Sequence, residues 1–412
     1  MISAHRAAFA GLAALALGMG IGRFAYTPLL PALIDEAGLS LQSAGYIASA
    51  NFAGYLIGAL GATRVPAHHR RTAFALGIAL SVLTTLSLAL LTSPWPLALS
   101  RALSGIASAV VMVQGSAIVL DILSAHRRPG LFPALYAGVG GGIALTAAIV
   151  EFMARSGATG ASTWMALALV AALLAWPAMG LRDPGPVAAS GSAGRTDSPG
   201  SDPPALASAP AMAPAPAPAT ASPFARARAL RWLMLAYGGL GFGYVITATF
   251  IVVMVRSRPD WKPYEMLVWC IVGLAAAPSN WLWQRLSDRA GPWTAMVAAY
   301  LLEAVGVAAA ALGEHLLAVF VGALLLGGTF MAITALGLTT ARALSAGASA
   351  QVVGRMTAAF GLGQMLGPAA GGWLAERSGS FAAPSLLAVA VLVGCAGVLA
   401  FTARQLTADS AR

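Results

Sequence analysis

An arginine stands inside an apolar segment near the start of the chain. Arg23 belongs to the string GMGIGRFAYTPLLPAL (18–33), within an apolar run from about residue 7 to 34. A charge at this depth of a bilayer costs from ~3 to more than 10 kcal/mol unless it faces protein or water. A guanidinium there can bind a carboxylate or phosphate through two hydrogen bonds, or pair with an internal acid. The residue therefore predicts either a binding cavity or a structural ion pair.

Other polar and aromatic side chains fall inside apolar segments and could line the same cavity. The polar candidates are Asn51, Tyr55, Gln114, Tyr244, Thr247, Asn280, Thr334 and Gln364. Each of them could instead hydrogen-bond between neighbouring helices. The aromatic candidates are Phe24, Tyr26, Trp281 and Trp283, and the two tryptophans could equally lie at the membrane interface. Glu303, near the middle of its segment, could exchange protons or simply pack inward.

The composition indicates an integral membrane protein. Of the 412 residues, 58% are hydrophobic and 9% are charged, and the mean hydropathy is +0.79. Soluble domains carry about 25% charged residues, so a soluble fold is excluded. The net charge of +10 lies mostly in short loops, which is a topogenic pattern and no sign of nucleic-acid binding. Cys270 and Cys395 fall in apolar segments as packing residues, and we expect no metal and no cofactor.

About 20 apolar residues cross a bilayer as a helix, and on that basis the chain has twelve segments. They run over about 7–34, 44–63, 72–92, 95–121, 131–153, 163–181, 232–255, 265–286, 293–312, 316–340, 354–375 and 381–402. The first is read as a retained helix, because its apolar run continues past any signal-peptide cleavage site. The arginine-rich loops, such as that at Arg70 and Arg71, place both termini in the cytoplasm.

A segment rich in Pro, Ala, Ser and Gly divides the chain. It begins at about residue 183 and includes PPALASAPAMAPAPAPATASP, which has no apolar periodicity and cannot bury a core. We therefore expect an N-terminal bundle of six helices at 1–182, a cytoplasmic linker at 183–230 and a second bundle of six helices at 231–412. The halves also resemble each other. GMGIGRF (18–24) matches GLGFGYV (239–245), and Arg155-Ser-Gly matches Arg377-Ser-Gly at a nearly equal offset.

These features resemble the major facilitator superfamily over nearly the whole chain. The strings at 18–33 and YGGLGFGYVITATFIVVM (237–254) are similar to the openings of the two halves in its YbfB/YjiJ-type branch. The resemblance implies an all-α fold of two pseudo-symmetric six-helix bundles in a bacterial inner membrane. It also implies that the first, fourth, seventh and tenth helices line a central cavity, where Arg23 and Tyr244 would face each other.

Further motifs carry expectations about coupling and gating. Asp288 and Arg289 lie in QRLSDRAG (284–291), which resembles the superfamily's Asp-Arg-x-Gly loop latch, although a solvated turn is the plain alternative. The matching loop of the first half lacks the acid, so Asp121 could pair with a loop arginine instead. Arg101 begins a string that resembles the superfamily's Arg-x-x-x-Gly motif, whose arginine is implicated in proton coupling in some members of the superfamily. Alternatively, the Arg101 side chain snorkels to the membrane interface. Glycine-rich strings (138–142 and Gly361, Gly363, Gly367 with Pro368) resemble those of exporters.

The sequence thus predicts a secondary active transporter and no enzyme. It would move a small organic solute by alternating access, and an anion is favoured if the solute is charged. The resemblance to the superfamily implies protons as the coupling ion. The alternative is a proton-antiporting efflux pump for drug-like or uncharged compounds, and a polytopic enzyme or sensor is a remote third. We expect a monomer in the lipid bilayer, whose partners are its substrate and protons, with no nucleic acid.

Overall fold

The computed structural model describes residues 2–181, 222–345 and 349–410, and every regular element among them is helical. The part before the linker holds α1 (Ala4–Leu15), the π-helix η1 (Ala16–Ile21), α2 (Tyr26–Ala37), α3 (Leu41–Ala62), η2 (Ala67–His69), α4 (Arg70–Ser87), α5 (Pro94–Ala125), η3 (Pro129–Leu131), α6 (Phe132–Arg155) and α7 (Gly160–Met179). The part after it holds α8 (Pro223–Arg256), η4 (Pro259–Tyr264), α9 (Glu265–Ala290), α10 (Pro292–Leu312), α11 (Leu316–Leu344), α12 (Ser349–Ser378) and α13 (Ala382–Ser410). We call residues 2–181 the N-terminal half and residues 222–410 the C-terminal half.

The linker prediction needs a correction at its end. Most of it, residues 183–221, lies outside the described residues. Residues 223–230, expected in the linker, are the first turns of α8. The Ser222 hydroxyl accepts a hydrogen bond from the Ala225 N–H at 3.2 Å, and Pro223 occupies the first helical turn. A serine cap followed by proline is a strong helix start.

Nine helical stretches in the described part are long and apolar enough to cross a membrane. They are 4–37, 94–125, 134–155, 160–179, 223–256, 259–290, 292–312, 316–344 and 382–409. The helices α3, α4 and α12 are not among them. Glycines and polar residues are frequent in α3 and α12, and two arginines begin α4, so their apolar character is lower.

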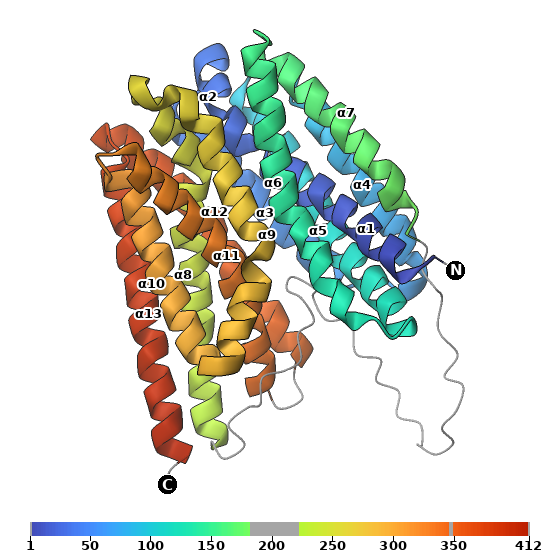
Figure 1. Ribbon diagram of the computed structural model, residues 1–412, viewed down its shortest axis with the longest axis vertical. Helices are drawn as coiled ribbons and strands as arrows, with labels where there is room; N and C mark the ends of the chain where they lie inside the picture. Colours follow the sequence, from blue (N-terminus) through green and yellow to red (C-terminus); the bar gives the residue numbers. More distant parts are fainter. Residues whose placement is uncertain (1, 182–221, 346–348, 411–412) are drawn as a thin grey trace.

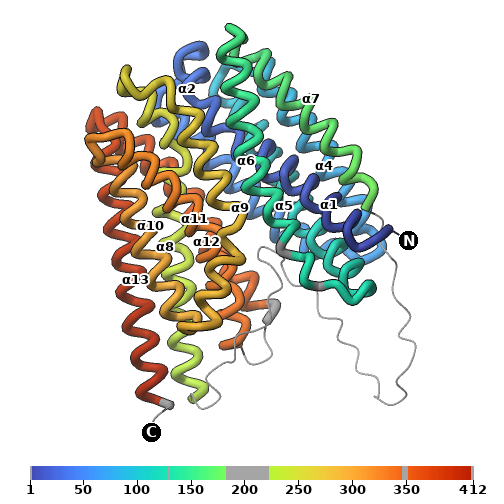
Figure 2. Tube along the Cα trace, viewed as in Figure 1, coloured from blue at the N-terminus to red at the C-terminus, as the bar shows by residue number. Residues whose placement is uncertain are grey.

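The two halves lie side by side and diverge toward one end (Figures 1 and 2). Helices α1, α4, α5 and α7 gather on one side of the view and α8, α10 and α13 on the other, while α2, α6 and α9 approach each other at the upper end (Figure 1). The main contacts between the halves join α3 to α12 and α6 to α9.

The first predicted segment is not one continuous helix. After α1 the backbone widens into the π-helix η1, with the N–H of Gly22 donating to the Leu17 carbonyl at 2.8 Å and that of Phe24 to the Met19 carbonyl at 3.0 Å. A turn follows before α2 begins at Tyr26. Glycines at 18, 20 and 22 weaken the α-helix here, and Pro28 brings no N–H to the next turn. Arg23 therefore sits in an interrupted helix.

Glycines bring the two halves into backbone contact. A Cβ placed on Gly140 of α6 would lie 2.5 Å from the Ala277 backbone nitrogen of α9, and one on Gly45 of α3 would clash with the Pro368 carbonyl of α12. Small residues at such crossings let membrane helices pack closely. The close approach at Gly140 is therefore one place where the halves are held together.

We expect Gly140→Val to destabilise the protein, because the added side chain would force α6 and α9 apart. Overpacking of this kind costs about 1–3 kcal/mol. The matched control is Gly141→Val, since a Cβ on Gly141 would meet no atom within 4 Å. Thermal unfolding of the purified variants in detergent measures the effect. Equal melting temperatures for the two variants would contradict the prediction.

Candidate functional site

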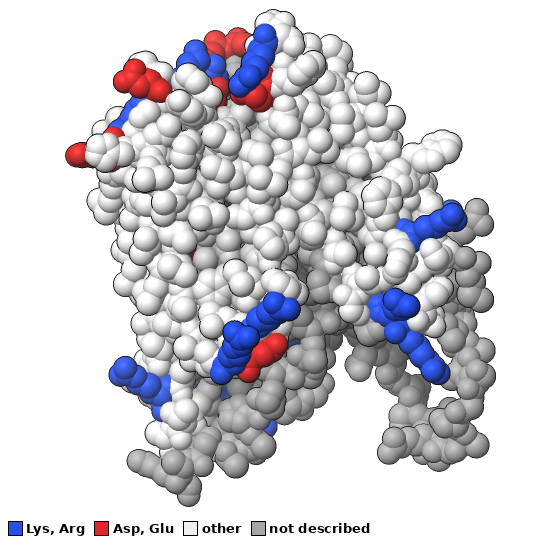
Figure 3. All heavy atoms as spheres, in the orientation of Figure 1, with Lys and Arg blue, Asp and Glu red and all other residues white. Residues whose placement is uncertain are grey.

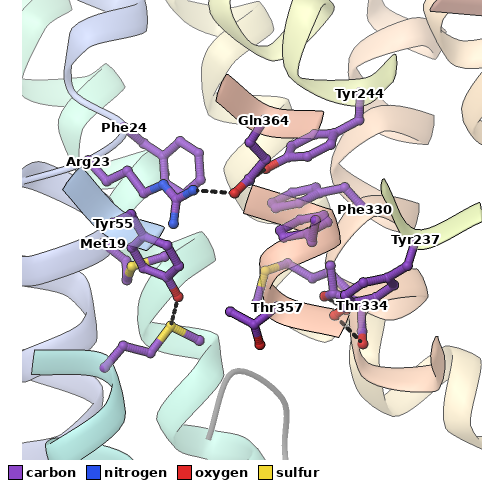
Figure 4. A pocket seen from close by; sticks show the side chains of 13 residues that line it. Met19, Arg23, Phe24, Tyr55, Tyr237, Tyr244, Phe330, Thr334, Thr357 and Gln364 are labelled. Carbon is purple, nitrogen blue, oxygen red and sulfur yellow. Dashed lines mark hydrogen bonds between the residues drawn. The ribbon is translucent and has the colours of Figure 1, made fainter. Parts of the chain in front are cut away.

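A cavity with about 500 Å³ of empty volume lies between the two halves. Side chains from the N-terminal half lie on one side and those from the C-terminal half on the other (Figure 4). The lining residues are Met19, Arg23, Phe24, Tyr55, Met112, Tyr237, Tyr244, Phe330, Met331, Thr334, Thr357, Phe360 and Gln364.

A chain of hydrogen bonds crosses the cavity between the halves. The Nη2 of Arg23 donates to the Oε1 of Gln364 at 2.8 Å, and the Nε2 of Gln364 donates to the hydroxyl of Tyr244 at 2.5 Å. Figure 4 shows Arg23 reaching from the N-terminal side to Gln364 on the opposite wall. The structure thus brings together Arg23, Tyr244 and Gln364, three residues that the sequence picked out on separate segments.

Arg23 is the one formally charged side chain among the described residues that line the cavity. Its side chain is 4% exposed, and no described carboxylate lies within ion-pair distance of it. The guanidinium carbon lies 3.9 Å from the ring centre of Tyr55 and 4.7 Å from that of Phe52, close enough for cation–π attraction. Its Nε atom is buried and donates to no described group. The buried cation is therefore stabilised by rings and one amide, and its charge is left without a counterion in the described structure.

Aromatic rings form the wall that the C-terminal half contributes. The ring of Tyr244 lies nearly parallel to that of Phe330 at 5.2 Å and to that of Phe360 at 6.0 Å. Phe24 of the N-terminal half meets Phe330 at 6.3 Å with a steep tilt. We call Tyr244, Phe330 and Phe360 the aromatic wall. Offset parallel rings and edge contacts are the favourable arrangements for such side chains.

Arg101 of α5 points into the protein. It is 2% exposed and donates from Nη1 to the Gly22 carbonyl at 2.7 Å and from Nη2 to the Arg23 carbonyl at 2.6 Å. The Ser104 hydroxyl adds a bond of 2.6 Å to the Gly22 carbonyl. These carbonyls lie where the first helix is interrupted, so they lack regular helical partners. Arg101 is thus a positioning residue for the turn that carries Arg23, and it does not snorkel to the interface here.

Four predicted cavity residues lie elsewhere between helices. Asn51 donates to the Arg101 carbonyl at 2.8 Å, and Gln114 donates to the Ala62 carbonyl at 2.6 Å, so both tie α3 to α5. Thr247 of α8 and Asn280 of α9 are buried but do not line the cavity. Asn51 and Gln114 therefore form hydrogen bonds between helices, which was the alternative to lining the cavity. Of the remaining candidates, Tyr55 and Thr334 do line the cavity.

Glu303 lies behind the aromatic wall. It is fully buried in α10, and one of its carboxylate oxygens accepts a hydrogen bond from the Thr329 hydroxyl of α11. The other oxygen has no hydrogen-bond partner among the described residues. Thr329 directly precedes Phe330, so the acid contacts the helix that carries part of the cavity lining. Glu303 therefore packs against its own half. The sequence had left open whether it packs inward or exchanges protons.

The loop candidates lie outside the cavity lining. Asp121 pairs with Arg70 at 2.8 Å, which confirms the predicted pairing with a loop arginine. Asp288 accepts a hydrogen bond from Gln284 one turn earlier at 2.6 Å, and neither it nor Arg289 forms an ion pair within the described part of the chain. The Asp288–Arg289 pair thus lies in an exposed helix end in this structure.

The aromatic and glycine candidates divide between cavity and packing. Trp281 is exposed with Arg285 stacked on it, as expected at a membrane interface, and Trp283 donates to the Gly328 carbonyl at 2.7 Å. Phe24 lines the cavity, whereas the Tyr26 hydroxyl donates to the Ala44 carbonyl. Gly363 and Gly367 pack against α8, and Pro368 lies at the crossing of α12 with α3.

The sequence reasoning missed most of the apolar lining. Phe330, Phe360 and Tyr237 belong to it, with three methionines. A helical spacing could have found two of these residues, since Tyr237 precedes Tyr244 by seven positions and Phe360 precedes Gln364 by four, which puts each pair on one helix face.

The cavity lies between two sets of apolar helices of a membrane protein and includes a buried cation among its described lining residues. The chain belongs to the family described as "Uncharacterised MFS-type transporter YbfB", which matches residues 15–207 and 203–400. It is therefore a multi-pass membrane protein of the MFS transporter type, with a small-molecule substrate.

Solved structures share the fold. The chain resembles the crystal structure of the nucleoside transporter NupG in its D323A mutant, with a TM-score of 0.72 and 13% identity over 96% of this chain and 99% of that one. It also resembles another crystal structure of NupG, with a TM-score of 0.65 and 14% identity over 98% of each chain. No curated protein matches the sequence. Within the described residues, no group of three or more His, Cys, Asp or Glu could hold a metal ion.

We expect Arg101→Ala to destabilise the protein because it leaves the Gly22 and Arg23 carbonyls with fewer donors. A buried polar group without a partner costs about 1–3 kcal/mol. Ser104→Ala removes only one of these hydrogen bonds and is the matched control, with a smaller loss. Thermal unfolding in detergent ranks the variants, and a melting temperature for Arg101→Ala at or above that of Ser104→Ala would refute this role.

Proposed function

We propose that the protein is a secondary active transporter with twelve membrane-spanning helices in two six-helix bundles. It moves a small organic solute across a bacterial inner membrane by alternating access, as a monomer with both termini in the cytoplasm. The observation that carries the proposal is the cavity between the halves, closed by a hydrogen bond from Arg23 to Gln364. A site shared by two halves is what rocking of one half against the other would open and close.

Contacts on one side of the cavity support alternating access. At the ends of α2 and α8, Asp35 pairs with Arg256 at 3.4 Å, and Arg256 lies 3.7 Å from Glu265. Nearby, the N–H of Gln42 donates to Glu376 at 2.7 Å. At the opposite end, the helices of the two halves diverge (Figures 1 and 2). This arrangement fits an inward-facing form whose outer side is latched.

The charge distribution supports the proposed orientation. Figure 3 shows acidic and basic groups mixed at the upper end and mainly basic groups at the lower end. Basic residues favour the cytoplasmic side of a bacterial membrane. The lower end, where the chain's C-terminus lies (Figure 1), is therefore the proposed cytoplasmic side.

Glu303 supports proton coupling. A fully buried carboxyl with an unpartnered oxygen among the described residues is costly, and intramembrane acids of this kind commonly take part in proton relays. Its hydrogen bond to Thr329 connects it to α11, so a change in its protonation would act on the helix that holds Phe330. This is the route by which a proton would bias the cavity.

Arg23 supports an anionic solute, because a lone buried cation attracts negative charge and repels cations. One observation favours the alternative, a proton-antiporting efflux pump for drug-like or uncharged compounds. It is the aromatic and methionine-rich lining, which would also accept an apolar molecule. Flux of charged against uncharged solutes separates the two functions.

We expect Arg23→Gln to reduce the transport of small organic anions at least tenfold, because each lost hydrogen bond to a charged group is worth about 1.5–3 kcal/mol. The assay is uptake and efflux in proteoliposomes with an imposed pH gradient. The control is Arg285→Gln, since Arg285 stacks on the exposed Trp281 outside the cavity. If Arg23→Gln transports as well as the wild type, the cavity charge has no role in transport.

We expect Asp35→Asn to open the outer side more often. Exposed ion pairs contribute about 0–1 kcal/mol, so access from outside should rise by up to about fivefold. The readout is the labelling of a cysteine at the cavity position Thr334 by an impermeant thiol reagent, after Cys270 and Cys395 are replaced by alanine. The control is Glu151→Gln, whose partner Arg155 lies in the same helix. Labelling that does not exceed the control would exclude a latch at Asp35.

A further inference from the structure

The cavity offers one positive charge and a largely apolar lining. Among the described residues that line it, Arg23 is the single charged side chain and none is an acid. A solute with one negative charge would be neutralised, whereas a dianion would keep an uncompensated charge in a buried site. A cation would meet repulsion with nothing to offset it. The charge balance therefore favours a monoanion.

The guanidinium can receive the solute only through its edge. Tyr55 covers its face at 3.9 Å, so the free direction lies in the guanidinium plane. On that edge Nη2 donates to the neutral amide of Gln364, and the buried Nε atom has no hydrogen-bond partner among the described residues. A carboxylate is planar and binds such an edge with two parallel hydrogen bonds. Its charge would make a stronger acceptor than the Gln364 amide that it replaces.

The rest of the lining has little capacity for polar solutes. The Tyr237 hydroxyl donates to the Thr334 carbonyl at 3.1 Å, and the Tyr55 hydroxyl contacts the Met112 sulfur at 3.1 Å. The Tyr244 hydroxyl accepts a hydrogen bond from Gln364, and the lining residue Thr357 adds a further hydroxyl to this surface. A solute with many hydroxyl groups would therefore lose hydrogen bonds to water without replacing them.

The aromatic wall offers flat ring surfaces next to Arg23. Tyr244 lies parallel to both Phe330 and Phe360, and Gln364 connects Tyr244 to Arg23 directly. Figure 4 shows the rings of Tyr244 and Phe330 across the cavity from the guanidinium. A planar ring gains from such neighbours beyond the area that it buries, whereas a saturated ring of the same size gains only the area.

We infer that the cavity binds small aromatic monocarboxylates, with the carboxylate on the edge of Arg23 and the ring against the aromatic wall. The inference rests on the proposed transport function and names its substrate class. Tyr55 holds the guanidinium so that its edge faces the cavity, and Gln364 releases Nη2 when the carboxylate arrives.

The test is calorimetric binding to the purified full-length protein at about pH 7.5, where simple carboxylic acids are ionised. The probes are benzoate, benzamide, cyclohexanecarboxylate and phthalate. We expect benzoate to bind at least tenfold more tightly than benzamide, which lacks the charge, and than phthalate, which has one charge too many. Cyclohexanecarboxylate should bind about 2- to 10-fold more weakly than benzoate, because it lacks a flat ring. Equal binding of benzoate and benzamide, or no benzoate binding at all, would overturn the inference.

Two variants assign the preferences to their side chains. Arg23→Gln should abolish the discrimination between benzoate and benzamide, and Phe330→Leu should abolish that between benzoate and cyclohexanecarboxylate. The control is Phe152→Leu, because Phe152 is exposed and far along α6 from the cavity lining. If Phe330→Leu keeps the wild-type preference for the flat ring, the placement of the ring is wrong.

Flux measurements separate this inference from the proposed function. Benzoate that binds but shows no protein-dependent flux in proteoliposomes leaves the substrate class intact and counts against transport. Flux of other solutes, without any benzoate binding, leaves the transporter intact and counts against the class.

Discussion

The interruption of the first helix leaves backbone carbonyls that must be hydrogen-bonded by other residues of the N-terminal half. Within a membrane, a backbone carbonyl that leaves its helix must find another donor. At Gly22 and Arg23 that donor is Arg101, with Ser104 beside it. The same turn directs Arg23 into the cavity. Arg101 therefore supplies the hydrogen bonds that the Gly22 and Arg23 carbonyls need. The donors of the Arg23 side chain thus stay available for a solute.

The halves meet most closely at two pairs of helices, and the cavity lies between the halves. Glycines allow backbone contact where α6 crosses α9 and where α3 crosses α12. Between these crossings, larger side chains leave space that Arg23 and the aromatic wall border. Gln364 is central to this arrangement, because it contacts Arg23 on one side and Tyr244 on the other. A movement of either half would break that bridge first.

The two matching strings have taken different structural roles. Arg23 of the first half corresponds to Tyr244 of the second, and the structure brings them to opposite ends of one hydrogen-bond chain. The first string is interrupted, whereas α8 is continuous over Pro223–Arg256. Pro28 and Pro31 follow the first string, and nothing like them follows the second. The repeated string thus forms an interrupted segment with Arg23 in the first half and a continuous helix with Tyr244 in the second half.

The sequence by itself determined the class of the protein and its most important charge. Hydropathy revealed the apolar helices, because the bilayer demands long apolar runs, and the cost of a buried arginine singled out Arg23. The sequence also identified Tyr244, Tyr55 and Gln364 as polar residues at that depth. It could not separate them from Asn51 and Gln114, because facing a cavity or a neighbouring helix depends on helix rotation and packing. Only the tertiary structure decided that Arg101 supports the broken backbone, and that Phe330 and Phe360 meet Tyr244 from distant segments.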